Sequence, residues 1–145
     1  MANAYSEPNR SEREHVGRVA NGLSEADCTR PAGGPGWTVG GLLAHLAFWD
    51  LRVTALLEAW KRRGIGPSPM DVDVLNDAMR ELCNAIPARA VVALALSAAA
   101  SADAAVDALE PEMIARIQSE GGPVRLDRAA HRRHHLAQIE AALVP

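Results

Sequence analysis

The stretch VGGLLAHLAFWDLRVTALLEAWKRR, residues 39–63, decides the fold. Its apolar residues recur at the three- and four-residue spacing of an α-helix, so that one face of the helix is apolar. Thr38 stands in the position of an N-cap before this run, and Gly64 follows it in the position of a C-cap. The sequence therefore predicts one long helix whose buried stripe consists of Leu42, His45, Leu46, Trp49, Val53, Leu56, Leu57 and Trp60.

The rest of the chain repeats this helical pattern and lacks the alternation of a strand. Ser11 and Glu14 have capping-box spacing and predict the start of a first helix, which ends at Gly22. Proline and glycine residues delimit the remaining helices. These are predicted over residues 72–85, from 87 to before 111, and over about 125–143.

The predicted fold class is all-α, an up-down four-helix bundle with one short inserted helix over residues 72–85. With 145 residues, 48% of them hydrophobic, the chain is long enough for one compact core and too short for two. We therefore expect a single domain over residues 1–145.

Charge and hydropathy narrow the classes of partner. The net charge is −3 and the basic residues are dispersed, which argues against nucleic acid and anionic membranes as partners. The start of the chain lacks an apolar stretch behind a basic end, and the longest apolar run, residues 90–100, is about half a membrane span. We expect a cytoplasmic protein with a small-molecule substrate, reduced Cys28 and Cys83, and pairing into a homodimer, which is common for small bundles.

The last predicted helix contains AAHRRHHLAQIE, residues 129–140, which holds three of the five histidines of the chain. Projected on a helix, His131 and His135 lie one turn apart at the edge of the buried face. His134 points away from that face, and Arg132 and Arg133 are expected to carry their charges to the surface.

His45, on the long helix, is the only other histidine predicted to face inward. Imidazoles at positions i and i+4 are close enough to meet one ion at about 2.0–2.1 Å, and a bundle core can bring a third ligand to them. The alternative is that each is an ordinary half-buried histidine bonded to a backbone or carboxylate group. The coincidence of all three on two long helices favours a metal site made of His45, His131 and His135.

Three segments resemble one known family. GWTVGGLLAHLAFWD (36–50) and HRRHHLAQIE (131–140) resemble the helix-two and terminal motifs of the DinB/YfiT-like superfamily, and DVLNDAM (73–79) resembles the middle of its mycothiol-dependent maleylpyruvate isomerase-like branch. The resemblance implies a four-helix bundle with a divalent metal held by three histidines, carried over onto His45, His131 and His135. His15 and His134 match no ligand position.

Three neutral imidazoles leave an ion with open coordination positions, as in catalytic rather than structural sites. They suit zinc, nickel, cobalt or iron. The resemblance implies enzymes that use mycothiol or bacillithiol as cosubstrate, so a metal-dependent thiol transferase or isomerase is the first hypothesis. A metal-dependent hydrolase and a non-catalytic protein that sequesters a small molecule remain as alternatives, and the catalytic residues are unknown.

Residues of four further types could contribute to a site, but the sequence says less about their roles. Asp103 is expected either to accept a hydrogen bond from a histidine N–H or to reach solvent at the edge of its helix. Asn76 occupies a polar position without an assignable role, and Cys83 has no adjacent base that would activate it. The three tryptophans are expected in the core rather than in a pocket: Trp37, Trp49 and Trp60.

Overall fold

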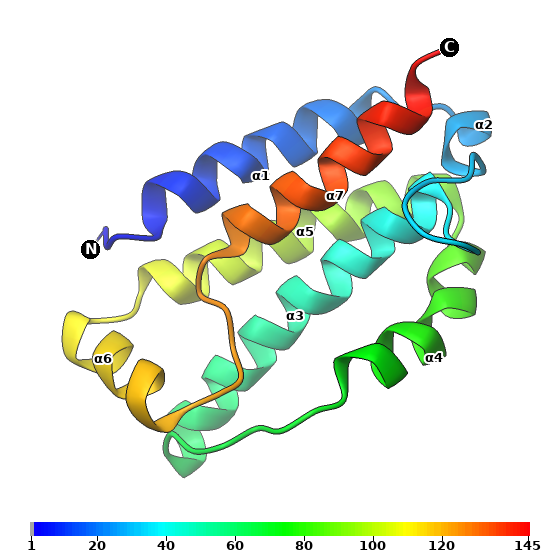
Figure 1. Cartoon of the computed structure of the whole chain (residues 1–145). Helices are drawn as coiled ribbons and strands as arrows, with labels where there is room; N and C mark the ends of the chain where they lie inside the picture. Colours follow the sequence, from blue (N-terminus) through cyan, green and yellow to red (C-terminus); the bar gives the residue numbers. More distant parts are fainter. Residues whose placement is uncertain (1) are drawn as a thin grey trace.

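The computed structural model describes residues 2–145 and is helical throughout, apart from connecting loops and isolated bridges (Figure 1). The described residues form seven helices. They are α1 (Ser6–Asn21), α2 (Glu25–Cys28), α3 (Val39–Arg63), α4 (Val72–Ala85), α5 (Ala88–Asp107), α6 (Pro111–Glu120) and α7 (Arg128–Leu143).

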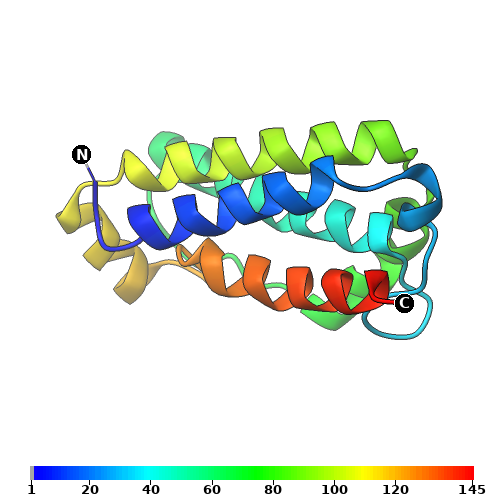
Figure 2. The same ribbon diagram turned by 90° about the horizontal axis from the view of Figure 1, so that it is seen from above.

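Four long helices, α1, α3, α5 and α7, form the predicted four-helix bundle (Figures 1 and 2). The helices α1 and α7 run in one direction, and α3 and α5 run in the other. The chain does not alternate between α3 and α5, because the loop after α3 and the helix α4 lead it back along α3 before α5 begins. This return places α4 beside α3, where residues of both helices line a pocket.

The helix α3 packs against most of the other helices, and it begins and ends at the residues that the sequence predicted. The Thr38 hydroxyl accepts a hydrogen bond from the Gly41 N–H at 2.9 Å, so it is the N-cap that the sequence predicted. Every residue of the predicted stripe is buried except Trp49, which is half-buried. The burial extends beyond one stripe, because α4, α5 and α7 all pack against α3.

Two helix starts differ from the sequence prediction. The first helix begins at Ser6 rather than Ser11, and the capping box is formed instead by Ser24 and Asp27 at the start of α2. The last helix begins at Arg128, because the Asp127 carboxylate accepts a hydrogen bond from the Ala130 N–H and caps it. The prediction also missed α2 and α6, which are too short to show a clear periodicity.

The core consists of two apolar clusters, one at each end of the bundle. One cluster includes Leu43 and Leu136, and the other includes Trp60 and Ile117. Between them α3 and α7 carry polar side chains inside the bundle, all at most 5% exposed: His45, Asp50, Arg128 and Arg132. Buried polar groups require partners, and this middle layer holds the candidate site.

By length and composition alone, α3 and α5 could each cross a membrane. The most apolar window of α3 is 72% buried within the bundle, and that of α5 is 39% buried. A helix in the core of a bundle is also long and apolar, so the packing of α3 inside the bundle is enough to explain its apolar composition.

Candidate metal centre

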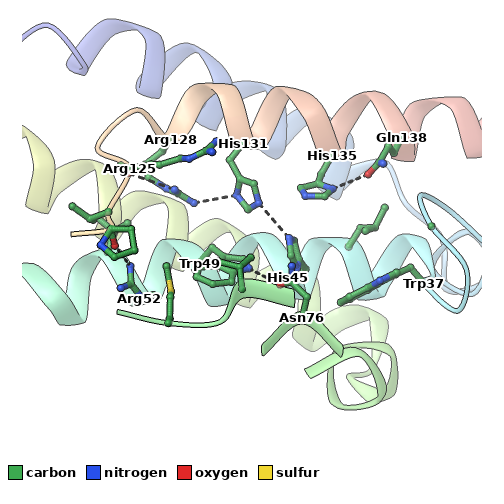
Figure 3. A pocket seen from close by; sticks show the side chains of 17 residues that line it. Trp37, His45, Trp49, Arg52, Asn76, Arg125, Arg128, His131, His135 and Gln138 are labelled. Atoms are coloured by element: carbon green, nitrogen blue, oxygen red, sulfur yellow. Dashed lines mark hydrogen bonds between the residues drawn. The ribbon is translucent and has the colours of Figure 1, made fainter. Parts of the chain in front are cut away.

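Three histidines converge in the middle layer, one from α3 and two from successive turns of α7 (Figure 3). The Nε2 atoms of His45 and His131 are 3.2 Å apart, and the ring centroids of His45 and His135 are 4.6 Å apart. One nitrogen from each ring lies within 4.8 Å of the others. Nitrogens that share a tetrahedral ion at about 2.0–2.1 Å are separated by roughly 3.3 Å, so the cluster is close to the spacing a shared ion requires.

The other two histidines lie apart from this cluster's centre. His134 is exposed, as the helical projection predicted. His15 lies on α1, where its ring nitrogens contact Glu12 at 3.1 Å and Glu140 at 2.8 Å. The structure therefore brings together the three histidines that the sequence selected and leaves out the two that it rejected.

The three imidazoles are held in the neutral form. Burial lowers the pKa of His45 from its ordinary value to about 4, helped by the neighbouring His135 and Arg128. Burial also lowers the pKa of His131, together with the charge of Arg128, and it lowers the pKa of His135. A metal ligand must be a neutral imidazole, so the site is prepared for a cation at neutral pH.

Hydrogen bonds at the outer nitrogens orient two of the rings. The Nδ1 atom of His135 lies 2.7 Å from the Gln138 amide oxygen, an arrangement in which Nδ1–H donates and the Nε2 lone pair faces the cluster. The Nδ1 atom of His131 instead faces Nη2 of Arg128 at 3.1 Å. The Nδ1 atom of His45 is buried without a partner among the described residues.

A pocket of about 460 Å³ opens beside the histidines, between α3, α4, α7 and the loop that precedes α7 (Figure 3). Trp37 and Trp49 line it, and the ring centroid of Trp37 is 5.3 Å from that of His45. Both tryptophans pack half-buried against the core, as expected, but the expectation that they do not line a pocket was wrong. Trp60 belongs to the core alone. The helical spacing of Trp49 with leucines placed it correctly on the buried face, but that face also forms the wall of the pocket.

A buried network of charges supports the floor of the site. The carboxylate of Asp50 accepts hydrogen bonds from Nε of Arg128 at 2.7 Å and from Nη2 of Arg132 at 3.1 Å. Arg132 is fully buried, so the prediction that it reaches the surface was wrong. Its charge is matched inside by Asp50 and by Asp103, whose carboxylate lies 2.8 Å from Nη1 of Arg132.

The sequence did contain a signal for this network. Asp50 stands four residues after Leu46 and three before Val53, so it occupies the buried face of α3. A carboxylate at such a position needs a buried cationic partner. In the structure Arg128 and Arg132 supply it, although Arg132 was expected at the surface from the sequence.

The remaining candidate residues have structural settings of their own. Asp103 is buried and pairs with Arg132 and, at 3.4 Å, with Arg13, so it neither contacts a histidine nor reaches solvent; burial raises its pKa despite these arginines. Asn76 lines the pocket and accepts a hydrogen bond from the Trp49 indole N–H at 3.2 Å. Cys83 is a free thiol in the core, and burial raises its pKa.

The family comparison covers this whole arrangement. The model described as "Mycothiol maleylpyruvate isomerase N-terminal domain" matches residues 10–140, which include all three histidines. The chain belongs to this family. The match confirms the resemblance to DinB/YfiT-like proteins and the all-α fold that it implied. No curated protein and no solved structure matches the chain.

Proposed function

We propose that this protein binds a divalent metal ion through His45, His131 and His135 and acts as an enzyme on a small electrophile, with a low-molecular-weight thiol of the mycothiol or bacillithiol type as cosubstrate. The observation that carries the proposal is the convergence of three neutral imidazoles beside an open pocket. Membership of a mycothiol-related family supports the choice of thiol.

The residues present suit a catalytic metal better than a structural one. Structural zinc sites are closed by four protein ligands, whereas catalytic sites have three and keep a position open. Among the described residues the cluster has three candidate ligands, and no cysteine or carboxylate joins them. The pocket next to the histidines leaves space for a fourth ligand that is not part of the protein.

When bound, a divalent ion would lower the pKa of a thiol, so that the thiol reaches the site as the nucleophilic thiolate. The chain itself supplies the surroundings of the reaction. His45 and the two histidines of α7 would hold the ion, and Gln138 fixes the orientation of His135. The indoles of Trp37 and Trp49 supply an apolar wall of the pocket.

The test begins with protein purified without chelator, whose metal content is measured by elemental analysis. We expect close to one equivalent of metal per chain, lost in His131→Ala. The loaded protein is then incubated with mycothiol, bacillithiol or cysteine and the electrophile 1-chloro-2,4-dinitrobenzene, and conjugate formation is followed against the chelated protein as control.

Turnover that requires metal and one of the two larger thiols supports the proposal. Metal without any thiol-dependent turnover would contradict the enzymatic part, and stoichiometric uptake of the electrophile would identify a sequestering protein instead. If the metal-free protein is incubated with zinc, nickel, cobalt or iron and retains none of them after the excess is removed, the metal site itself is contradicted.

A cytoplasmic location and a small-molecule substrate belong to the same proposal, supported by the family match and by the size of the pocket. The homodimer stays a prediction of the sequence. Analytical ultracentrifugation at several protein concentrations would test it.

A further inference from the structure

The outer face of α5 carries no charge along most of its length. The charged residues of this helix are Arg89 near its start, Asp107 at its end, and Asp103, which is buried and paired with Arg132. The exposed residues between Arg89 and Asp107 are all alanine or serine, namely Ala90, Ala93, Ser97, Ala100, Ser101 and Ala104. A helix at the surface of a bundle ordinarily directs charged side chains to water, so the outer face of α5 is suited to contact with protein.

The neighbouring helix α3 extends this uncharged surface. The exposed residues of α3 before Glu58 are Phe48, Leu51 and Ala55, which the spacing of three and four residues places on one face. Phe48 is 37% exposed and Leu51 is 42% exposed. Because α3 and α5 pack side by side and run in the same direction (Figures 1 and 2), their outer faces adjoin. A contiguous exposed apolar surface of this kind marks a site of interaction.

This surface is separate from the candidate metal centre. The residues described as lining the pocket include none from α5, and none of the three exposed apolar residues of α3. On α3 the pocket is lined instead by His45, Trp49 and Arg52, which lie on a different face of the helix. A partner bound to the outer face of α5 therefore leaves the pocket open.

The two ends of the α5 surface carry opposite charges. Arg89 lies at one end, and Glu110, three residues after the last residue of α5, lies at the other. Both residues are exposed, and neither side chain makes a hydrogen bond or an ion pair within residues 2–145. A surface that is positive at one end and negative at the other is complementary to its own copy, turned by a two-fold axis through its middle. The charges therefore favour a second copy of this chain as the partner.

The positions of the small residues along α5 define a register for such a pair. In an antiparallel pair centred between Ser97 and Ala100, Ala93 lies opposite the partner's Ala104. The side chains at the centre are small, so the two helix axes can approach to about 8 Å, the close end of the range for packed helices. Arg89 then lies roughly 3 Å along the axis from the partner's Glu110, at 1.5 Å per residue, which is within reach of its long side chain.

We propose that this protein forms a homodimer in which α5 packs antiparallel against α5 of a second copy. Phe48 and Leu51 of α3 flank the contact, and Arg89 pairs with the partner's Glu110 at each end. The inference goes beyond the proposed function, because the contact needs neither metal nor thiol.

Sedimentation equilibrium of the full-length protein measures the dissociation constant of the dimer. The central variant is Ala100→Glu, which places a carboxylate against the same carboxylate of the second copy. The matched control, Ala141→Glu, changes an exposed alanine of α7. We expect Ala100→Glu to weaken the dimer at least about a hundredfold, because apposed like charges in an interface are strongly unfavourable, and Ala141→Glu to leave it unchanged. Both alanines are exposed, so both variants should keep the helical circular dichroism of the parent protein.

Exchange of the two end charges tests the register. Arg89→Glu and Glu110→Arg should each weaken the dimer about tenfold, since each change replaces two ion pairs with two like-charge contacts. The double variant Arg89→Glu/Glu110→Arg forms the pairs again in reverse and should bring the dissociation constant back to within about threefold of the parent.

A protein that stays monomeric at every concentration would overturn the proposal, as would one that floats with phosphatidylcholine vesicles instead of pairing. A dimer that is indifferent to Ala100→Glu would show that another surface is used. A double charge variant as weak as the single ones would contradict the antiparallel register. Metal content is expected to be the same in all these variants, so the failure of this inference and that of the metal site are distinguishable.

Discussion

The guanidinium of Arg128 faces the imidazole of His131, with Nη2 and Nδ1 separated by 3.1 Å. Because arginine only donates hydrogen bonds, Nδ1 of His131 must accept, and in the neutral ring the proton then lies on Nε2. That atom is 3.2 Å from Nε2 of His45, which completes a chain of hydrogen bonds from Arg128 through both histidines. Histidines that bind metal ordinarily donate their second N–H to a carboxylate, carbonyl or water.

This relationship predicts that Arg128 competes with metal for His131. In Arg128→Gln, the amide oxygen offers an acceptor for Nδ1–H, and one positive charge near the cation is removed. We expect metal affinity to rise by about tenfold, the scale at which outer partners of metal ligands act. Isothermal titration with zinc measures it. Arg125→Gln removes the same charge without touching His131 and serves as control; weaker binding by a folded Arg128→Gln protein would show that Arg128 supports the metal instead.

The three histidines are expected to act as ligands of one ion. His45→Ala, His131→Ala and His135→Ala should each lower metal affinity by more than the 10–100-fold range typical of changes outside the ligands. His134→Ala, exposed on the same helix, should leave the affinity unchanged. Competition with a chromogenic chelator gives the affinities. An equal loss in His134→Ala would show that the ligand set is different.

Folding is expected to be independent of metal. The two apolar clusters and the charge network of α1, α3, α5 and α7 surround the histidines without needing an ion. Circular dichroism of the chelated protein should retain its helical signal, with a cooperative thermal transition. Loss of that signal on chelation would mean that the ion is structural and would count against the catalytic proposal.

Acid is expected to destabilise the metal-free protein. His45 has a folded-state pKa of about 4 against about 6.5 in an unfolded chain, so the unfolded state binds more protons between these values. The contribution of this group to stability is fully present above pH 6.5 and is lost as pH falls from there toward 4. Denaturant titrations across this range measure the slope. His45→Leu should reduce the slope, whereas an unchanged slope would contradict the assignment.

The charge network is expected to be essential for stability. Asp50→Asn removes a buried carboxylate that binds two buried arginines, and breaking such a pair costs about 3–5 kcal/mol. Glu58→Gln, which removes an exposed carboxylate paired with Lys61, should change the stability far less than Asp50→Asn does. Urea unfolding of both variants makes the comparison. Similar costs in the two would show that the network is solvated in solution.

The histidine set could be predicted because it follows from helical periodicity alone. His45 shares a face with leucines on α3, and His131 and His135 are one turn apart on α7, so one projection orients all three. The burial of Arg132 was missed, because an arginine is ordinarily expected to carry its charge to solvent. Its burial depends on Asp50 and Asp103, which belong to other helices.

The pocket could not be predicted for a similar reason. Its walls come from α3, α4, α7 and the loop before α7, so no single segment carries its shape. Trp49 has the same spacing as its core neighbours, and only the position of α4 decides that it borders a cavity. The shared direction of α3 and α5, which departs from the up-down alternation expected of the bundle, was likewise inaccessible, because it depends on the path of the loop after α3.

The bond between His45 and His131 joins residues 86 positions apart. Contacts of this kind form late, because the cost of closing a long loop must be met before the contact contributes. His131 and His135 become neighbours as soon as α7 coils, but the third imidazole joins them only when α7 docks on α3. During synthesis α7 emerges after α1 to α6, so uptake of a metal by the complete triad would report that the four long helices have assembled.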